Sequence, residues 1–347
     1  MKGLFLINIF KVIFVIIGTF IGAGFASGKE IYIFFYKYNI WGIIGILISS
    51  GMIFYIMCKT LIISKENKIE NYNEFLDDLI KQKIIKKILK EIINLFLIIS
   101  YCIMISGFCS FIKQEFNINY FFSFLFIIIL CIYSFRKKIN SIFKLNNILI
   151  PIIIIIILFI FIMNIFNQGI IDKFNCIIKM NNEFNFNFFT SSILYANYNL
   201  LTIIPIIITI KNTLKNKKQI KIACIVTVIF ICILSLAIFC ILITKNNEYI
   251  NFDMPAVAII SSYGKKYKIL YCLIIGIAIA TTAISVGYSY LQKFENKERI
   301  YNKKMILLII FSAISLKIGF SNLVEILYPV FGIIGFIESI YVIKYRN

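Results

Sequence analysis

The sequence contains no histidine, and its 347 residues include only 16 acidic residues, four prolines and one tryptophan. Without histidine the chain cannot supply imidazole metal ligands, a Ser-His-Asp catalytic set or a histidine proton relay. Nine cysteines are present, but none forms a CxxC pair and almost all fall within apolar stretches, so we expect small buried hydrophobic residues. No set of residues typical of an active site can be assembled, and we expect no enzymatic activity.

Hydrophobic residues, in contrast, are abundant. They make up 61% of the chain, charged residues make up 15%, and the mean hydropathy is +0.92. This composition excludes an ordinary soluble globule. Several apolar runs reach the roughly 20 residues that cross about 30 Å of hydrocarbon. The sequence therefore predicts an all-α polytopic membrane protein with about ten transmembrane helices, whose surroundings are the lipid bilayer.

The formal charge of +20 could indicate a nucleic-acid-binding protein, but the lysines lie in short loops between apolar runs. Such loops leave no basic domain surface, so we expect no nucleic-acid partner. Lysine and arginine instead gather on the cytoplasmic side of membrane proteins. We predict spans at about 8–36, 40–63, 91–112, 119–135, 146–166, 188–210, 220–244, 269–291, 304–319 and 322–343.

The charges give this map an orientation. With the N-terminus inside, 26 of the 36 basic residues fall in cytoplasmic segments. We therefore expect a multi-pass protein of the cytoplasmic membrane with both termini in the cytoplasm. Nothing in the sequence indicates an oligomeric state. Between spans, residues 70–90 are expected to form one amphipathic helix, because Leu76, Ile80, Ile84 and Ile88 recur every four residues. The segment Phe252–Ile260 is expected to form a short helix folded back onto the protein.

The chain 1–347 is expected to be a single membrane transport domain made of two repeats, about 8–166 and about 188–343. Five spans per repeat is an odd number, so the second repeat enters the membrane from the opposite face. The first span of each repeat carries an interruption: Gly18–Gly28 holds four glycines, and Ser191–Asn199 is polar and is followed by Pro205. Matching breaks in inverted halves are typical of transporters with a site near the bilayer midplane. We therefore predict that helices 1 and 6 are both interrupted.

The breaks supply the candidate substrate-binding residues. Half-helix ends expose unpaired N–H and C=O groups that bind anions and cations, respectively. In span 1, Gly22, Ala23 and Gly24 allow close approach to the backbone and Phe25 could close over a ligand; tight helix packing is the alternative. In span 6 the candidates are Tyr195, Asn197, Tyr198 and Asn199, for which hydrogen bonding between helices is the alternative.

A candidate Na⁺ site is carried by Thr281, Thr282 and Ser285, whose hydroxyls lie on or near one face of span 8. Serine and threonine often bond to their own helix instead. Four acids lie near the spans: Glu30, Asp253, Glu325 and Glu338. Lys29 is next to the first of these and Lys344 lies six residues after the last, so ion pairing at the membrane interface is expected for most of them. Without a buried acid pair, Na⁺ coupling is favoured over proton coupling.

The string Gly18-Thr-Phe-Ile-Gly-Ala-Gly-Phe-Ala-Ser-Gly-Lys-Glu-Ile31 resembles the signature of YkvI-type bacterial membrane proteins. Shorter matching pieces are Tyr195–Leu200, Thr281–Tyr288, Gly319–Val324 and Tyr328–Gly332, so the resemblance spans nearly the whole chain. These proteins are regarded as distant members of the amino acid, polyamine and organocation (APC) superfamily, which has a LeuT-like fold.

The resemblance implies a five-plus-five inverted repeat with substrate held between spans 1, 3, 6 and 8. In sodium-coupled relatives a cation site joins span 1 carbonyls to adjacent hydroxyls of span 8, here Thr281 and Thr282. Some proton-coupled relatives place a lysine in span 5, and this span 5 has none. The expected function is secondary active transport of a small amino acid or related amine or zwitterion by alternating access, with no cofactor apart from Na⁺ as coupling ion. The alternative is a transporter-like sensor that binds a ligand without carrying it.

Overall fold

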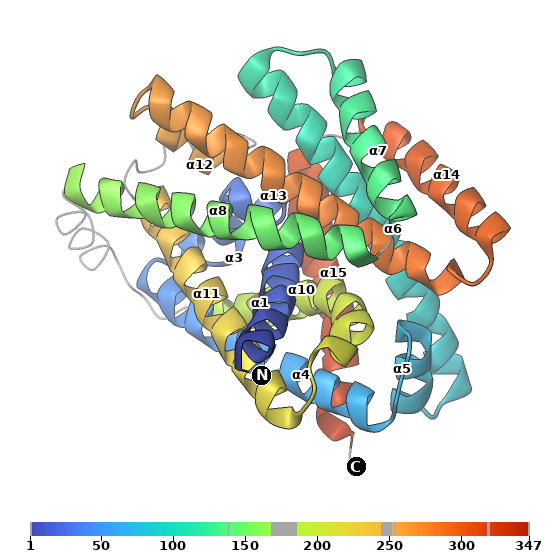
Figure 1. Ribbon diagram of the computed structural model, residues 1–347. Helices are drawn as coiled ribbons and strands as arrows, with labels where there is room; N and C mark the ends of the chain where they lie inside the picture. Colours follow the sequence, from blue (N-terminus) through green and yellow to red (C-terminus); the bar gives the residue numbers. More distant parts are fainter. Residues whose placement is uncertain are drawn as a thin grey trace.

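We describe a computed structural model of the chain for residues 2–137, 139–167, 186–243, 252, 254–317 and 320–345. All elements in this part of the chain are α-helices or short 3-10 helices, arranged as a bundle (Figure 1). Their bounds are α1 Lys2–Phe20, α2 Ala23–Ala26, α3 Lys29–Phe34, η1 Tyr36–Tyr38, α4 Ile40–Glu66, α5 Tyr72–Leu79, α6 Lys83–Phe116, α7 Tyr120–Arg136, α8 Ile139–Asn167, α10 Asn187–Ile210, η2 Lys211–Thr213, α11 Lys217–Ile243, α12 Pro255–Ser261, α13 Lys265–Leu291, η4 Gln292–Phe294, α14 Glu298–Ser315 and α15 Phe320–Lys344.

The long helices match the predicted spans one for one. Among the described residues, seven helices are long and apolar enough to cross a membrane, and Ile7–Phe20 and Tyr120–Arg136 are shorter apolar helices. The ninth predicted span corresponds to α14, which begins earlier than predicted and carries charged residues in its first turns. The chain is therefore an α-helical, multi-pass membrane protein, while the inverted relation of its halves stays a prediction.

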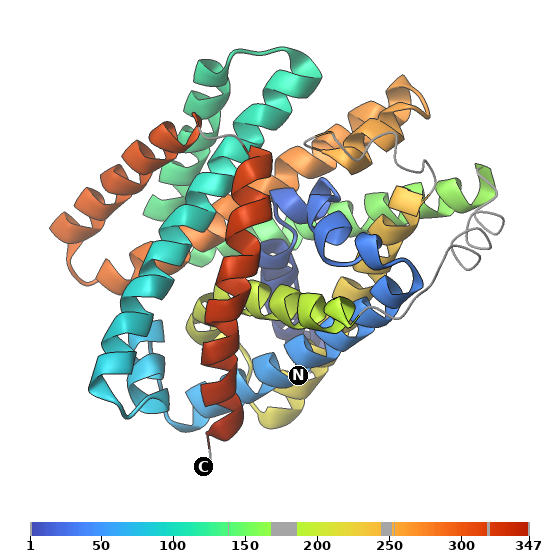
Figure 2. The same cartoon turned by 180° about the vertical axis from the view of Figure 1, so that it is seen from behind.

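Lysines join distant segments of the chain at both ends of the bundle. At one end, the Lys59 ammonium donates a hydrogen bond to the carbonyl of Ile343 (2.8 Å). This end also holds both termini and α5, which lie in the lower part of both views (Figures 1 and 2). At the other end, Lys268 pairs with Glu115 (2.8 Å), and α12, the expected short helix, lies in the upper left part of Figure 1. The predicted loop positions are thus mutually consistent.

The first span is broken, as its glycines predict. Helix α1 ends at Phe20, and two non-helical joints follow. The first joint, Ile21–Gly22, separates α1 from the four residues of α2, and the second joint, Ser27–Gly28, separates α2 from α3. Gly28 has φ +79°, a conformation that glycine adopts at little cost and other residues rarely adopt. The backbone of Ser27 also accepts a hydrogen bond from the Ala256 N–H of α12 (2.9 Å), which ties the second joint to the folded-back helix.

The predicted interruption of helix 6 is wrong, because α10 runs unbroken from Asn187 to Ile210. Its polar side chains bond to carbonyls of their own helix: Asn199 donates to Tyr195 (3.0 Å) and Thr202 donates to Asn199 (2.7 Å). Local bonds of this kind satisfy polar groups without opening the helix. Pro205 removes one N–H donor from the helix but does not end it.

The single amphipathic helix predicted for residues 70–90 is also wrong. The chain forms the short helix α5, leaves helical conformation from Ile80 to Gln82, and begins α6 at Lys83. Leu76 and Ile80 are fully buried, whereas Ile84 and Ile88 are 76% and 53% exposed, so they do not share one face. The four-residue spacing of apolar residues continues across a turn of the chain, so it does not mark one face of a single helix.

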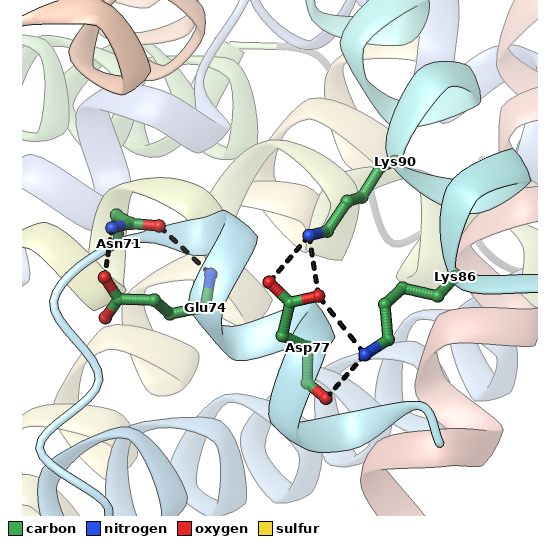
Figure 3. Close-up of polar contacts among 5 residues, drawn as sticks. All are labelled: Asn71, Glu74, Asp77, Lys86 and Lys90. Atoms are coloured by element: carbon green, nitrogen blue, oxygen red, sulfur yellow. Dashed lines mark hydrogen bonds and ion pairs between the residues drawn. The ribbon is translucent and has the colours of Figure 1, made fainter. Parts of the chain in front are cut away.

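Helix α5 is held at its start by a cap and at its end by an ion pair (Figure 3). Asn71 accepts a hydrogen bond from the backbone N–H of Glu74 (3.0 Å) and donates one to its carboxylate (2.6 Å). Asp77 is paired with Lys90 (2.8 Å) and Lys86 (3.2 Å) at the start of α6. Partial burial raises the pKa of Asp77, but the hydrogen bonds and charges of the two lysines outweigh it and the net pKa lies below its usual value.

The buried face of α5 contacts the interior through Tyr72. Its hydroxyl donates a hydrogen bond to the carboxylate of Glu338 on α15 (2.8 Å), and both side chains are buried. The expected pairing of Glu338 with Lys344 is therefore replaced by a tie between α15 and α5. Asp253 lies outside the described residues.

Candidate functional site

A small cavity lies against the break in the first span. It measures about 20 Å³, room for about one water molecule. Its wall comes from α1, the first joint, α3, α6, α10, α13 and α15, so segments far apart in the sequence meet there. The lining residues are Thr19, Phe20, Gly22, Glu30, Phe96, Ser100, Met104, Tyr198, Asn199, Thr202, Thr282, Val286 and Tyr328.

Thr282 connects α13 to the end of α1. Its hydroxyl lies 2.9 Å from the carbonyl oxygen of Gly18 and 2.8 Å from that of Ile21, and the side chain is 3% exposed. These carbonyls are near the C-terminal end of α1, where carbonyl groups lack the N–H donors they have within a helix. A hydroxyl within bonding distance of two carbonyls supplies oxygen ligands of the kind that a small hard cation binds. Of the two hydroxyls that the resemblance places beside span 1 carbonyls, that of Thr282 makes this contact.

The two other residues of the predicted Na⁺ site lie differently. Thr281 donates to the carbonyls of Ile277 and Ala278 on its own helix (3.0 Å each) and lines a separate apolar cleft of about 480 Å³. Ser285 is fully buried, and its hydroxyl has no hydrogen-bond partner among the described residues. Ser289 bonds to the carbonyl of Ser285 (2.8 Å), so that turn of α13 is itself a polar patch in the interior.

The glycines of the break give room to particular neighbours. A Cβ added at Gly22 would lie 3.1 Å from the Met104 side chain, and one at Gly24 would collide with the Glu30 carboxyl group. Ala23 and Phe25 are buried without lining the cavity; the N–H of Ala23 lies 3.4 Å from the Met104 sulfur, and the Phe25 ring packs edge-on against Phe20 (5.1 Å). Close approach of the backbone is thus realised at Gly22 and Gly24.

The candidates on α10 divide into two groups. Tyr198 and Asn199 line the cavity. Tyr195 packs among aromatic rings behind it, 4.7 Å from Phe35 between ring centroids. The Asn197 amide oxygen instead accepts a hydrogen bond from Ser339 of α15 (2.5 Å), in a packing contact between the two helices. The structure therefore brings two of the four side chains to the cavity.

Glu30 is the cavity residue that sequence reasoning assigned to another role. The expected pair with Lys29 is not formed, because Lys29 pairs with Glu325 of α15 (2.8 Å). Glu30 is 2% exposed, and its carboxyl group accepts a hydrogen bond from the Tyr198 hydroxyl. The signal that could have found it is its position two residues after the last glycine of the break, where a helical turn folds back over Gly24.

Among the described residues, seven helices long and apolar enough to cross a membrane, with a broken first span beside a buried cavity, define a polytopic helical membrane protein. No protein-family model matches the chain. The chain is 25% identical over 327 residues to a Bacillus subtilis (strain 168) protein named uncharacterized membrane protein YkvI, covering 93% of this chain and 91% of that one. It is 24% identical over 332 residues to uncharacterized protein YyaD of the same strain, covering 94% and 93%. These near full-length matches confirm the relation to YkvI-type membrane proteins.

Proposed function

We propose that this protein is a secondary transporter of the cytoplasmic membrane that moves a small amino acid or related amine or zwitterion by alternating access. The observation that carries the proposal is the cavity at the broken first span, where Gly22, Glu30 and Thr282 meet from three segments. Broken helices beside buried polar groups are the feature that substrate sites in transporters share. In this interpretation both termini are cytoplasmic and Na⁺ is the coupling ion, bound through Thr282.

The size of the cavity supports an occluded conformation. A space of about 20 Å³ is too small for any amino acid, so the surrounding helices must move before a substrate enters. The buried tie between Tyr72 and Glu338 keeps α5 packed at the end of the bundle that carries the termini. Alternating access would then require this tie to open when the site faces the cytoplasm.

Two measurements on the purified full-length protein test the proposal. Thermal unfolding is followed in sodium and in potassium buffer with a panel of amino acids and amines, since a ligand that binds only the folded state raises its melting temperature. Uptake of the stabilising compounds into proteoliposomes is then measured with and without a sodium gradient. Uptake driven by the gradient is expected. Stabilisation without uptake would favour the sensor, and neither effect across the panel would contradict both.

A matched pair of variants tests the ion. Thr282→Val removes the hydroxyl beside the α1 carbonyls, whereas Thr281→Val removes one that bonds to its own helix. We expect the first variant to lose the difference between sodium and potassium and the second to keep it. Equal sodium dependence in both variants would show that the Thr282 site binds no coupling ion.

A further inference from the structure

Glu30 presents a carboxyl group to the cavity from a fully enclosed position. It accepts hydrogen bonds from the Tyr198 hydroxyl and from the backbone N–H of Phe25. The absence of a side chain at Gly24 leaves the space that this carboxyl group fills, because a Cβ there would lie 2.8 Å from its carboxyl carbon. The carboxyl group is therefore fixed against the backbone of the break, with one side toward the cavity.

No cation faces this carboxyl group in the described part of the chain. Lys29 of the same helix pairs with Glu325, and Lys37 of η1 lies over the ring of Tyr32 (5.4 Å). None of the ion pairs found among the described residues includes Glu30.

The titratable groups around Glu30 are phenols. Tyr195 and Tyr198 face it from α10 and Tyr328 faces it from α15. On α13 the phenol of Tyr271 donates to the Ala26 carbonyl (2.7 Å). α1, α6 and α13 contribute only uncharged side chains to the lining, such as Thr19, Ser100 and Thr282, and α11 contributes none.

A buried carboxylate without a neighbouring cation is costly, so this group needs either a proton or a cation that comes from outside the chain. The walls suit an organic cation. Four aromatic rings line the cavity beside this carboxyl group, those of Phe20, Phe96, Tyr198 and Tyr328. Aromatic faces beside a carboxylate attract ammonium groups through cation–π and ionic contacts.

We infer, building on the proposed transport function, that Glu30 exchanges a proton for the ammonium group of the substrate. In the empty site the carboxyl O–H is intact. When the substrate binds, this bond breaks, the proton passes to water, and the carboxylate pairs with R–NH₃⁺. For an amine, one positive charge enters as one leaves, so the buried site keeps its net charge. A zwitterion also brings its carboxylate, whose charge the Na⁺ of the proposed function would balance. The substrate class is thereby narrowed to compounds with an ammonium group, with or without a carboxylate.

The experiment uses alanine, ethylamine and propionate as probes, because the latter two lack the carboxylate and the ammonium group of alanine, respectively. Full-length protein in weakly buffered detergent solution is titrated with each probe while pH is recorded. We expect alanine and ethylamine to bind with release of about one proton per site, and propionate to release none. The Kd values of alanine and ethylamine should fall about tenfold for each unit that pH rises in the lower part of a range from about pH 5 to about pH 9.

Variants assign the proton to Glu30. Glu30→Gln keeps an acceptor for the Tyr198 hydroxyl but should weaken amine binding at least tenfold and abolish proton release. Glu325→Gln, at the half-exposed carboxyl group that pairs with Lys29, is the control and should keep both. Binding of alanine and ethylamine without proton release, or with the same Kd at every pH, would overturn the inference and leave the transport proposal standing. Failure of wild-type protein to bind or carry any amino acid or amine would instead contradict the transport proposal.

Discussion

The first span and α10 begin the two predicted halves of the chain, yet only the first span is broken. Its Gly18–Gly28 stretch interrupts the helix at two places, whereas the polar Ser191–Asn199 stretch continues as a regular helix. Glycine lacks the side chain that restricts the backbone and that fills space between helices. Asparagine and threonine carry side chains that bond to carbonyls of their own helix. In this chain, glycines interrupt a membrane helix and polar side chains do not.

The largest effect is expected where α10 touches α15. A Cβ at Gly335 would collide with the backbone carbonyl of Asn197, which cannot move without moving the helix. Gly335→Ala should therefore cost about 3 kcal/mol, at the upper end for overpacking. The control is Gly51→Ala on α4, where a Cβ meets nothing within 4 Å and should be neutral or stabilising. Urea or thermal unfolding in detergent measures both, and equal stability of the two variants would show that the two helices are not in close contact.

A smaller loss is expected at the broken span. Thr282→Val leaves the buried carbonyls of Gly18 and Ile21 without the hydroxyl of α13, at a cost of about 2 kcal/mol. Thr281→Val removes only a bond within α13 and should cost about 0.5 kcal/mol or less. The ratio of the two losses, from unfolding in potassium buffer, checks whether the end of α1 depends on α13. A larger loss at Thr281 would contradict this dependence.

A loss of about 1 kcal/mol is expected for Asn197→Leu, because the hydrogen bond from Ser339 is removed. Asn197 does not line the cavity, so the Kd for a stabilising amine should be unchanged in the folded variant. Asn199 lies two residues later, on the side of α10 that lines the cavity, so Asn199→Leu should weaken the same binding. Isothermal titration on both variants sharpens the division of α10 into a packing side and a site side, and the reverse order of effects would refute it.

The smallest effect is a dependence of α5 on pH. The pKa of Asp77 is lower in the folded protein than in the unfolded chain, so its ion pairs contribute stability above the unfolded pKa of about 3.9. That stability is lost as pH falls through the lower folded pKa. Limited proteolysis between α5 and α6 should therefore become faster in acid for wild-type protein and change little for Asp77→Asn. Cleavage in acid at the same rate as near neutral pH would contradict the role of these pairs.

The sequence predicted the helical membrane class, the positions of the long helices, the break at the glycines and the short helix after residue 252, because each depends on hydrophobic length or on local backbone preference. It missed the turn at Ile80–Gln82, because apolar spacing does not record where a helix stops. It also misassigned Glu30 and Glu338. Ion pairing with a sequence neighbour was expected, but the partners of Lys29 and Glu338 lie on helices hundreds of residues away in the sequence. Which polar groups share the cavity depends on packing between helices, which a single sequence does not specify.

The four residues of α2 lie between two joints, at Ile21–Gly22 and at Ser27–Gly28. This segment is a short link between two helices. Helix α1 is anchored by Thr282 of α13, and the joint before α3 is tied to α12 through the Ser27 carbonyl. Two joints in series would allow α3 to tilt while α1 stays fixed, with α2 turning between them. Any such tilt would carry Glu30, the second residue of α3, toward or away from the rings of α10 and α15.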